Sequence, residues 1–219
     1  MPDSTRFTET MTGWLGPLAD TSAENTHEAA ASRGRTQGTD ALFTLTVLTA
    51  DADGMVADPR HPNPAFGVVW IPSLHPEPMG VSAGVLELFV DISPGIVHMR
   101  YVLPLLAGDG TRYCLRGIKE VVRRRPWPTV LTDTTTLFVD IYAGEHARGR
   151  PVRRGILTMG PSEVTMQGLS FRGGGRWWGL RGIITFMRYY VRTVAAIYLG
   201  GRSQPRRAEW SRIDGDPSA

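Results

Sequence analysis

The chain has 219 residues, of which 42% are hydrophobic, and this suits one large domain with a sizeable core. The net charge of +3 combines an acidic part, residues 1–91 with 4 Arg and 12 acids, and a basic part, residues 92–219 with 20 Arg plus Lys and 9 acids. The arginines are scattered and accompany no nucleic-acid motif, so we expect no nucleic-acid partner. A single cysteine, Cys114, excludes an internal disulfide framework, and the polar start of the chain has no secretory apolar segment. These features predict a cytoplasmic protein.

The first strand is predicted at residues 5–15, where Phe7, Glu9 and Met11 share one face. Between this strand and the next, Thr21 and Glu24 have the spacing of a capping box, which predicts a short exposed helix to residue 35. Two more strands are then predicted from alternating or continuous apolar runs, at residues 42–49 and 65–71.

Residues 51–55, with the sequence DADGM, resemble the start of a calcium-binding loop. The remaining oxygen ligands of such a loop, including its terminal glutamate, are missing. We therefore interpret this segment as an acidic turn.

Four consecutive runs between residues 83 and 142 predict the long strands at the centre of the fold. The run at residues 97–105 is apolar at every second position, as a strand buried on one side requires. Turn sequences separate the runs, with SPG at 93–95 and GDG at 108–110. The four predicted strands cover residues 85–90, 97–105, 112–118 and 129–142.

Two further strands are predicted at residues 153–159 and 164–171, joined by Gly160-Pro161-Ser162. About eight or nine strands without long helices between them exclude a parallel sheet, whose connections need long crossovers. A sheet of this size closes on itself to remove its edges. We predict an all-β protein, an antiparallel closed barrel of about eight strands with a lipocalin-like design. It forms one domain over residues 1–203, followed by a disordered polar tail at 204–219.

Residues 176–199 predict a long amphipathic helix that ends at Gly200-Gly201. Its arginines argue against a membrane span. Three roles stay open: a lid across the barrel, a dimer seam, or a basic helix on a membrane surface. The apolar stripe recurs at spacings of three and four, and it comprises Trp177, Leu180, Ile184, Met187, Val191, Val194 and Tyr198.

Few residues have the spacing of a known catalytic or metal site. The five histidines are isolated, and no nucleotide-binding glycine fingerprint is present, so we expect neither a metal nor a cofactor. Arg123-Arg124-Arg125-Pro126-Trp127 is interpreted as a solvated turn anchored by its tryptophan, with an anion-binding patch as the alternative. The glycine triplet at 173–175 is interpreted as a hinge.

Three residues are candidates for proton transfer, namely Glu87, Asp133 and Tyr101. Glu87 stands in an apolar strand, and it would be a general acid or base if it faced the barrel interior, or an ordinary surface carboxylate if it faced outward. Asp133 has the same ambiguity. Lys119-Glu120 is interpreted as a pair of neighbouring charges near a strand end.

Six segments, in this order, resemble a β-barrel accessory domain found with sterol-oxidase-like flavoproteins of the glucose–methanol–choline (GMC) family in actinobacteria. They are FTETMTG at 7–13, DPRH at 58–61, GVLELFV at 84–90, MRY at 99–101, GIKEV at 117–121 and TDTTTL at 132–137. The family pattern has Asn where this chain has Glu87, and the chain has no flavin fingerprint, so oxidase activity is not implied. The resemblance implies hydrophobic substrates such as sterols or polyketide chains. Free-standing barrel proteins of this size also occur in actinobacterial polyketide pathways, including those of enediyne antibiotics.

The inward faces of such a barrel would line a cavity for a long apolar chain, held by burial of its methylenes. The first hypothesis is a homodimeric binding protein for a fatty-acyl or polyene-like polyketide intermediate of secondary metabolism. The second is a cofactor-free cyclase or isomerase, and the third is an interaction subunit of an oxidase or synthase. The predicted lining residues are Phe43, Leu45, Val47, Leu86, Leu88, Met99, Tyr101, Leu103, Leu137 and Val139.

Overall fold

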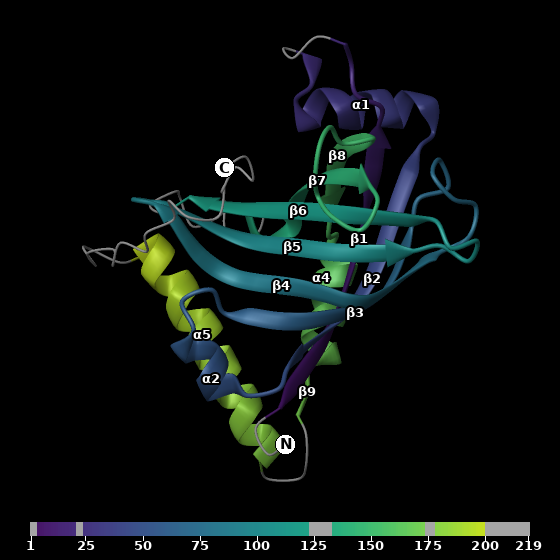
Figure 1. Cartoon of the computed structure of the whole chain (residues 1–219). Coiled ribbons are helices and arrows are strands. Elements are labelled where there is room, and N and C mark those ends of the chain that lie inside the picture. Colours follow the sequence, from purple (N-terminus) through teal and green to yellow (C-terminus); the bar gives the residue numbers. More distant parts are fainter. Residues whose placement is uncertain (1–3, 21–23, 123–132, 174–177, 200–219) are drawn as a thin grey trace, which may run out of the picture.

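Eight antiparallel strands close into a barrel in the computed structural model, which describes residues 4–20, 24–122, 133–173 and 178–199 (Figure 1). Consecutive strands from β2 to β8 pair with one another, and β1 closes the barrel by pairing with both β2 and β8. The predicted barrel is confirmed. Its strands are β1 (Thr5–Gly16), β2 (Asp40–Thr49), β3 (Pro62–Trp70), β4 (Met79–Ser93), β5 (Ile96–Leu106), β6 (Arg112–Val122), β7 (Thr136–Ala143) and β8 (Arg153–Thr158).

The two halves of β1 have different neighbours. Residues 5–14 of β1 pair with β2, but β8 pairs only with residues 12–16. Beside the first half, β9 (Arg172–Gly173) pairs with the first two residues, and α4 (Pro161–Ser170) packs along the rest. The Ser170 hydroxyl accepts a hydrogen bond from the Thr8 amide at 2.8 Å and lies 3.2 Å from the Thr8 carbonyl oxygen. Helix α4 therefore replaces a strand in this part of the wall.

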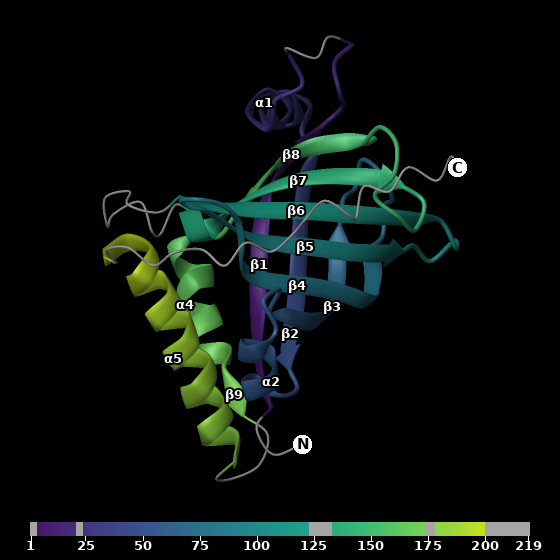
Figure 2. The same cartoon turned by 60° about the vertical axis from the view of Figure 1, so that its left-hand side comes forward.

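Helices α5, α2 and α1 lie around the barrel. Helix α5 (Trp178–Leu199) confirms the predicted C-terminal helix; it lies along the side of the barrel next to α4, and the two helices converge toward β9 (Figures 1 and 2). The short α2 (Ala52–Ala57) packs on α5. At the other end of the barrel, α1 (His27–Gln37) packs on β1 and β8.

Residues 164–170 belong to α4 and Phe171 is its C-cap, so the prediction of a strand at 164–171 is wrong. Pro161 is the first residue of α4, a position that suits proline because the missing amide would have no partner within the helix. The following apolar run is too short for its period to distinguish a helix from a strand. The sequence Gly160-Pro161-Ser162 therefore begins a helix instead of joining two strands.

Other boundaries differ more locally. Residues 51–55 begin α2, because the Asp51 side chain caps the helix by accepting a hydrogen bond from the Gly54 amide at 3.0 Å. Helix α1 begins at His27 with Thr26 as its cap and ends at Gln37 with Gly38 as its C-cap, whereas Thr21 of the predicted capping box lies outside the described residues. Strand β7 begins at Thr136 and residues 133–135 are helical, so the predicted strand is wrong at these three residues, while its residues 129–132 lie outside the described part of the chain.

Several sequence predictions fall on residues that the structure does not describe. They are the arginine-rich segment at 123–128, Gly174 and Gly175 of the glycine triplet, the first residues of the predicted stripe, and the tail at 204–219. Cys114 is described, and it is buried on β6.

Candidate functional site

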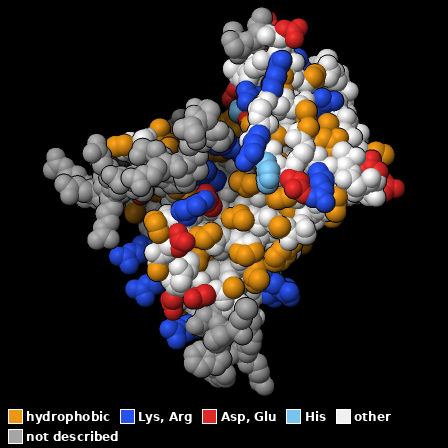
Figure 3. Space-filling view, in the orientation of Figure 1, with side chains coloured by type: hydrophobic (Ala, Val, Ile, Leu, Met, Phe, Trp, Pro, Cys, Tyr) orange, Lys and Arg blue, Asp and Glu red, His pale blue; other side chains and the backbone are white. Residues whose placement is uncertain are grey.

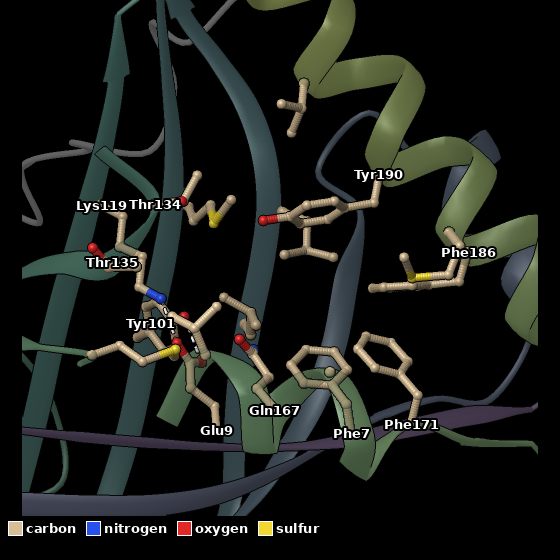
Figure 4. A pocket seen from close by; sticks show the side chains of 18 residues that line it. Phe7, Glu9, Tyr101, Lys119, Thr134, Thr135, Gln167, Phe171, Phe186 and Tyr190 are labelled. Atoms are coloured by element: carbon tan, nitrogen blue, oxygen red, sulfur yellow. Dashed lines mark hydrogen bonds and ion pairs between the residues drawn. The ribbon is translucent and has the colours of Figure 1, made fainter. Parts of the chain in front are cut away.

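A cavity of about 350 Å³ lies where the barrel wall changes from strands to helices (Figure 4). Strands β1, β4, β5 and β6 form one side of the cavity, and α4 and α5 form the other. The volume is at the lower end of the range for small-molecule sites. The lining is mostly apolar and comprises Phe7, Glu9, Leu86, Leu88, Met99, Tyr101, Lys119, Thr134, Thr135, Met159, Val164, Gln167, Gly168, Phe171, Phe186, Met187, Tyr190 and Val194.

Three polar side chains meet at the barrel side of this cavity. The Lys119 ammonium contacts Glu9 Oε1, and the Tyr101 hydroxyl donates to Glu9 Oε2 at 2.8 Å. Lys119 Nζ also lies 5.4 Å from the centroid of the Tyr101 ring, within cation–π range. The relative exposures are 1% for Glu9, 3% for Lys119 and 1% for Tyr101. We call these three residues the polar cluster.

Strand alternation explains why these polar groups point inward. Glu9 lies between Phe7 and Met11 on the inward face of β1, and Lys119 lies between Gly117 and Val121 on that of β6. The carboxylate and the ammonium therefore occupy interior positions that a core would fill with apolar side chains. Since burial of a single charge costs free energy, the contact between Glu9 and Lys119 is what allows both to be buried.

Aromatic rings form the wall that faces the polar cluster. Phe7 and Phe171 are stacked with ring centroids 5.0 Å apart, and Phe186 packs against both at 5.8 and 5.7 Å. Tyr190, from the next turn of α5, points its hydroxyl toward the Lys119 side of the cavity (Figure 4). These contacts join β1, α4 and α5 into one wall.

Both tyrosines of the cavity keep their protons at neutral pH. Burial, reinforced by the charge of Glu9 and its hydrogen bond, holds the pKa of Tyr101 well above its usual value. Burial, again with Glu9, raises the pKa of Tyr190 to about 12. Each hydroxyl is therefore a hydrogen-bond donor, and the site contains donors, a carboxylate and an amine in an apolar enclosure.

All ten predicted lining residues are buried, but only four of them line the cavity: Leu86, Leu88, Met99 and Tyr101. The other six lie in the part of the barrel that side chains fill. Sequence analysis missed Glu9 and Lys119 as site residues. The sequence did contain one signal for Glu9, because this acid lies on the same face of the predicted strand as the apolar Phe7 and Met11.

The other two catalytic candidates do not line the cavity. Glu87 is buried on β4 outside the barrel interior, where it contacts Arg60 and lies with Oε2 3.6 Å from Arg100 Nε. It is thus neither an interior acid nor an ordinary surface carboxylate. Asp133 is buried directly before Thr134 and Thr135, which do line the cavity.

Lys119 and Glu120 are not a pair, contrary to the prediction. Successive residues of a strand point to opposite faces, so Lys119 contacts Glu9 inside the barrel. Glu120 faces outward, with Oε2 3.3 Å from His98 Nε2. The neighbouring charges belong to different environments.

Helix α5 covers the open side of the barrel, as the lid alternative expects, but its buried face matches the predicted stripe only in part: Met187 and Val194 of the stripe line the cavity. Val194 of that stripe is buried, whereas Ile184 and Val191 are exposed. The face that packs on the barrel also carries Phe186 and Ile197. Apolar residues lie on both faces, so the spacing alone does not identify the buried one.

Apolar side chains also gather on the outer wall of the barrel over β4 and β5 (Figure 3). Val102 and Leu106 are 42% and 50% exposed, in alternation with the buried Tyr101, Leu103 and Leu105. Residues of the outer wall such as Val102 therefore lie on the same strands as the cavity residues but face outward.

Within the described ranges, no three His, Cys, Asp or Glu side chains are grouped as a metal site would require, and no helix is long and apolar enough to span a bilayer. Comparisons of the chain with protein-family models, with curated proteins and with solved structures find no match.

Proposed function

We propose that this protein binds an apolar chain, such as a fatty-acyl or polyketide intermediate, in the cavity between the barrel and α4 and α5. The observation that carries the proposal is an apolar cavity with one localised polar cluster. Burial of methylenes supplies about 0.8 kcal/mol for each group, and the few polar groups set the orientation of the ligand. Under this proposal the apolar part of the ligand contacts the Phe7, Phe171 and Phe186 wall.

The polar cluster favours an uncharged polar group at the end of the ligand. Lys119 and Glu9 carry opposite charges in contact, so their net charge is zero. A free carboxylate placed beside Lys119 would also lie close to the Glu9 carboxylate and would be repelled by it. A carbonyl or hydroxyl group can accept from Lys119 without this repulsion, and thioester-bound or ketone-bearing chains present such groups.

The test is native mass spectrometry of freshly purified protein, followed by extraction and identification of any bound molecule. A displacement titration of an environment-sensitive lipophilic dye with 1-decanol would then measure affinity. We expect Met99→Trp, which fills the cavity, to weaken binding about tenfold or more. The matched control is Val102→Trp, three residues along β5 on the outer wall, which should bind like the parent protein.

Circular dichroism melting of both variants would confirm that they are folded. Equal binding by the two variants would contradict the proposal. A parent protein that retains no lipid and binds none of the probes would do the same.

A second candidate function is that of a cofactor-free cyclase or isomerase acting on such a chain. The observation that favours it is that a carboxylate, an amine and two phenols share one apolar cavity, which suits general acid–base catalysis. In this case Glu9 joins Tyr101, which was already a candidate, as a group that transfers protons, and Glu87 and Asp133 have no such role because they do not line the cavity. Turnover of a ligand identified by extraction would establish it.

A further inference from the structure

Lys119 differs chemically from every other basic side chain in the protein. The chain has 24 basic residues besides histidine, and Lys119 is its single lysine among 23 arginines. A guanidinium stays protonated in proteins, whereas a lysine amine becomes a nucleophile once it loses a proton. The one residue with this ability lies inside the cavity, 3% exposed.

We propose that Lys119 forms a Schiff base with an aldehyde or ketone group of an apolar ligand. This inference rests on the proposed function, because the ligand must first occupy the cavity. It also narrows the ligand class from uncharged polar groups in general to reactive carbonyls.

The contacts of Glu9 supply the proton transfers that the reaction needs. Glu9 Oε1 is in contact with Lys119 Nζ and can accept a proton from the ammonium. Glu9 Oε2 accepts the Tyr101 hydroxyl, which holds the carboxylate in place beside the amine. Tyr101 is therefore a positioning residue, and Glu9 is the acid–base group.

Imine formation needs no proton carrier other than Glu9. Glu9 takes one proton from Lys119, and the free amine adds to the carbonyl carbon as the carbon–oxygen double bond becomes a single bond. A second nitrogen proton moves to that oxygen, giving a carbinolamine. Glu9 then returns its proton to the hydroxyl, water leaves, and the nitrogen lone pair forms the carbon–nitrogen double bond.

The charges before and after this reaction are the same. An ammonium–carboxylate pair becomes an iminium–carboxylate pair, and the two protons lost from nitrogen leave with the oxygen as water. An apolar enclosure opposes any step that leaves an isolated charge. The existing ion pair with Glu9 thus suits imine formation, because the product cation keeps the same partner.

The test uses the full chain with decanal and sodium cyanoborohydride, which reduces an imine to a stable amine. We expect one adduct per chain, located at Lys119 by peptide mapping. Because the chain has one lysine, the amino terminus is the other primary amine, and mapping separates the two sites. Glyceraldehyde, a polar aldehyde at the same concentration, should give far less adduct at Lys119.

Two variants test the roles assigned above. Glu9→Gln should slow labelling at Lys119 about 10²-fold, as loss of a general acid–base group does. Lys119→Arg should remove the internal adduct and leave labelling of the amino terminus unchanged. Mapping of the parent protein locates the adduct even if a variant does not fold.

The outcomes separate this inference from the proposed function. Displacement of the lipophilic dye by both 1-decanol and decanal, without an adduct at Lys119, would overturn the Schiff base and leave the binding function in place. No displacement and no adduct would overturn both. Equal labelling by decanal and glyceraldehyde would show reactivity unrelated to an apolar site, which also contradicts the inference.

Discussion

The two halves of the barrel interior are built by the same strands but are filled differently. In one half, Met11, Phe43, Leu103 and Leu115 are fully buried and pack against one another in the core. In the other half, the same strands β1, β5 and β6 carry Glu9, Tyr101 and Lys119, and a cavity remains. Tyr101 lies at the boundary, with its ring centroid 6.2 Å from that of Phe43.

The elements that flank β1 differ between the two halves, and the interior stays open where helices flank it. Around the packed half, β1 has a strand on each side. Around the open half, α4 and α5 replace β8 beside β1. The cavity lies in this half, between the strands and the two helices.

The largest effect is expected from removal of one charge of the polar cluster. Glu9→Gln leaves the buried Lys119 ammonium without its partner, which should lower the free energy of unfolding by about 3–5 kcal/mol. The double variant Glu9→Leu/Lys119→Met makes this half resemble the packed half and should restore the loss. Urea unfolding of the three proteins measures it.

A loss below about 1 kcal/mol in Glu9→Gln would show that cavity water solvates the ammonium. The polar cluster would then be hydrated, and the open half of the barrel would differ from the packed half by containing water as well as by its cavity.

A smaller effect should come from one substitution made in each half. Leu103→Ala removes a fully buried side chain of the packed half and should cost about 3 kcal/mol, since the surroundings cannot collapse. Leu86→Ala enlarges an existing cavity, loses fewer contacts, and should cost about 2 kcal/mol. Dye affinity should change in Leu86→Ala alone. The reverse order of stabilities would mean that the two halves are packed alike.

The smallest effect concerns Tyr190 and is confined to alkaline pH. Its pKa is raised to about 12 in the folded protein, so the folded state holds this proton more tightly than the unfolded state does. The resulting stability is complete below the usual tyrosine pKa of about 10 and is lost as pH rises from there through 12. Tyr190→Phe should match the parent at pH 7 and lose less stability between pH 10 and 12. The difference in tyrosine absorbance between the parent and Tyr190→Phe during an alkaline titration reports the pKa of this residue, and a value near 10 would contradict the burial.

The sequence predicted the strands best where one face is buried and turns are marked. Alternation in β2 and β5, with the turns at Ser93-Pro94-Gly95 and Gly108-Asp109-Gly110, was sufficient for most of the barrel. The wrong element, α4, is a short apolar segment in which the two periods are hard to distinguish. This segment packs along the first half of β1, which β8 does not reach, and the local sequence pattern does not contain this tertiary contact.

The candidate site was harder to predict because its charges are 110 residues apart. Glu9 was placed on the face of Phe7 and Met11, but the partner that permits its burial lies on another strand. Lys119 was interpreted beside its sequence neighbour Glu120, although strand geometry places them on opposite faces. Burial of a charge becomes predictable once strand pairing shows where its counter-charge lies.

The long separation between Glu9 and Lys119 also has a consequence for the order of folding. Strands β4 to β7 pair with their neighbours in sequence, and such local hairpins close with little loss of chain entropy. Strand β1 pairs with β8, and Thr8 contacts Ser170, 162 residues away. We expect the barrel to close last at β1, so the apolar interior is exposed until then. Pulse-labelling hydrogen exchange during refolding should protect the amides of β5 and β6 before those of β1.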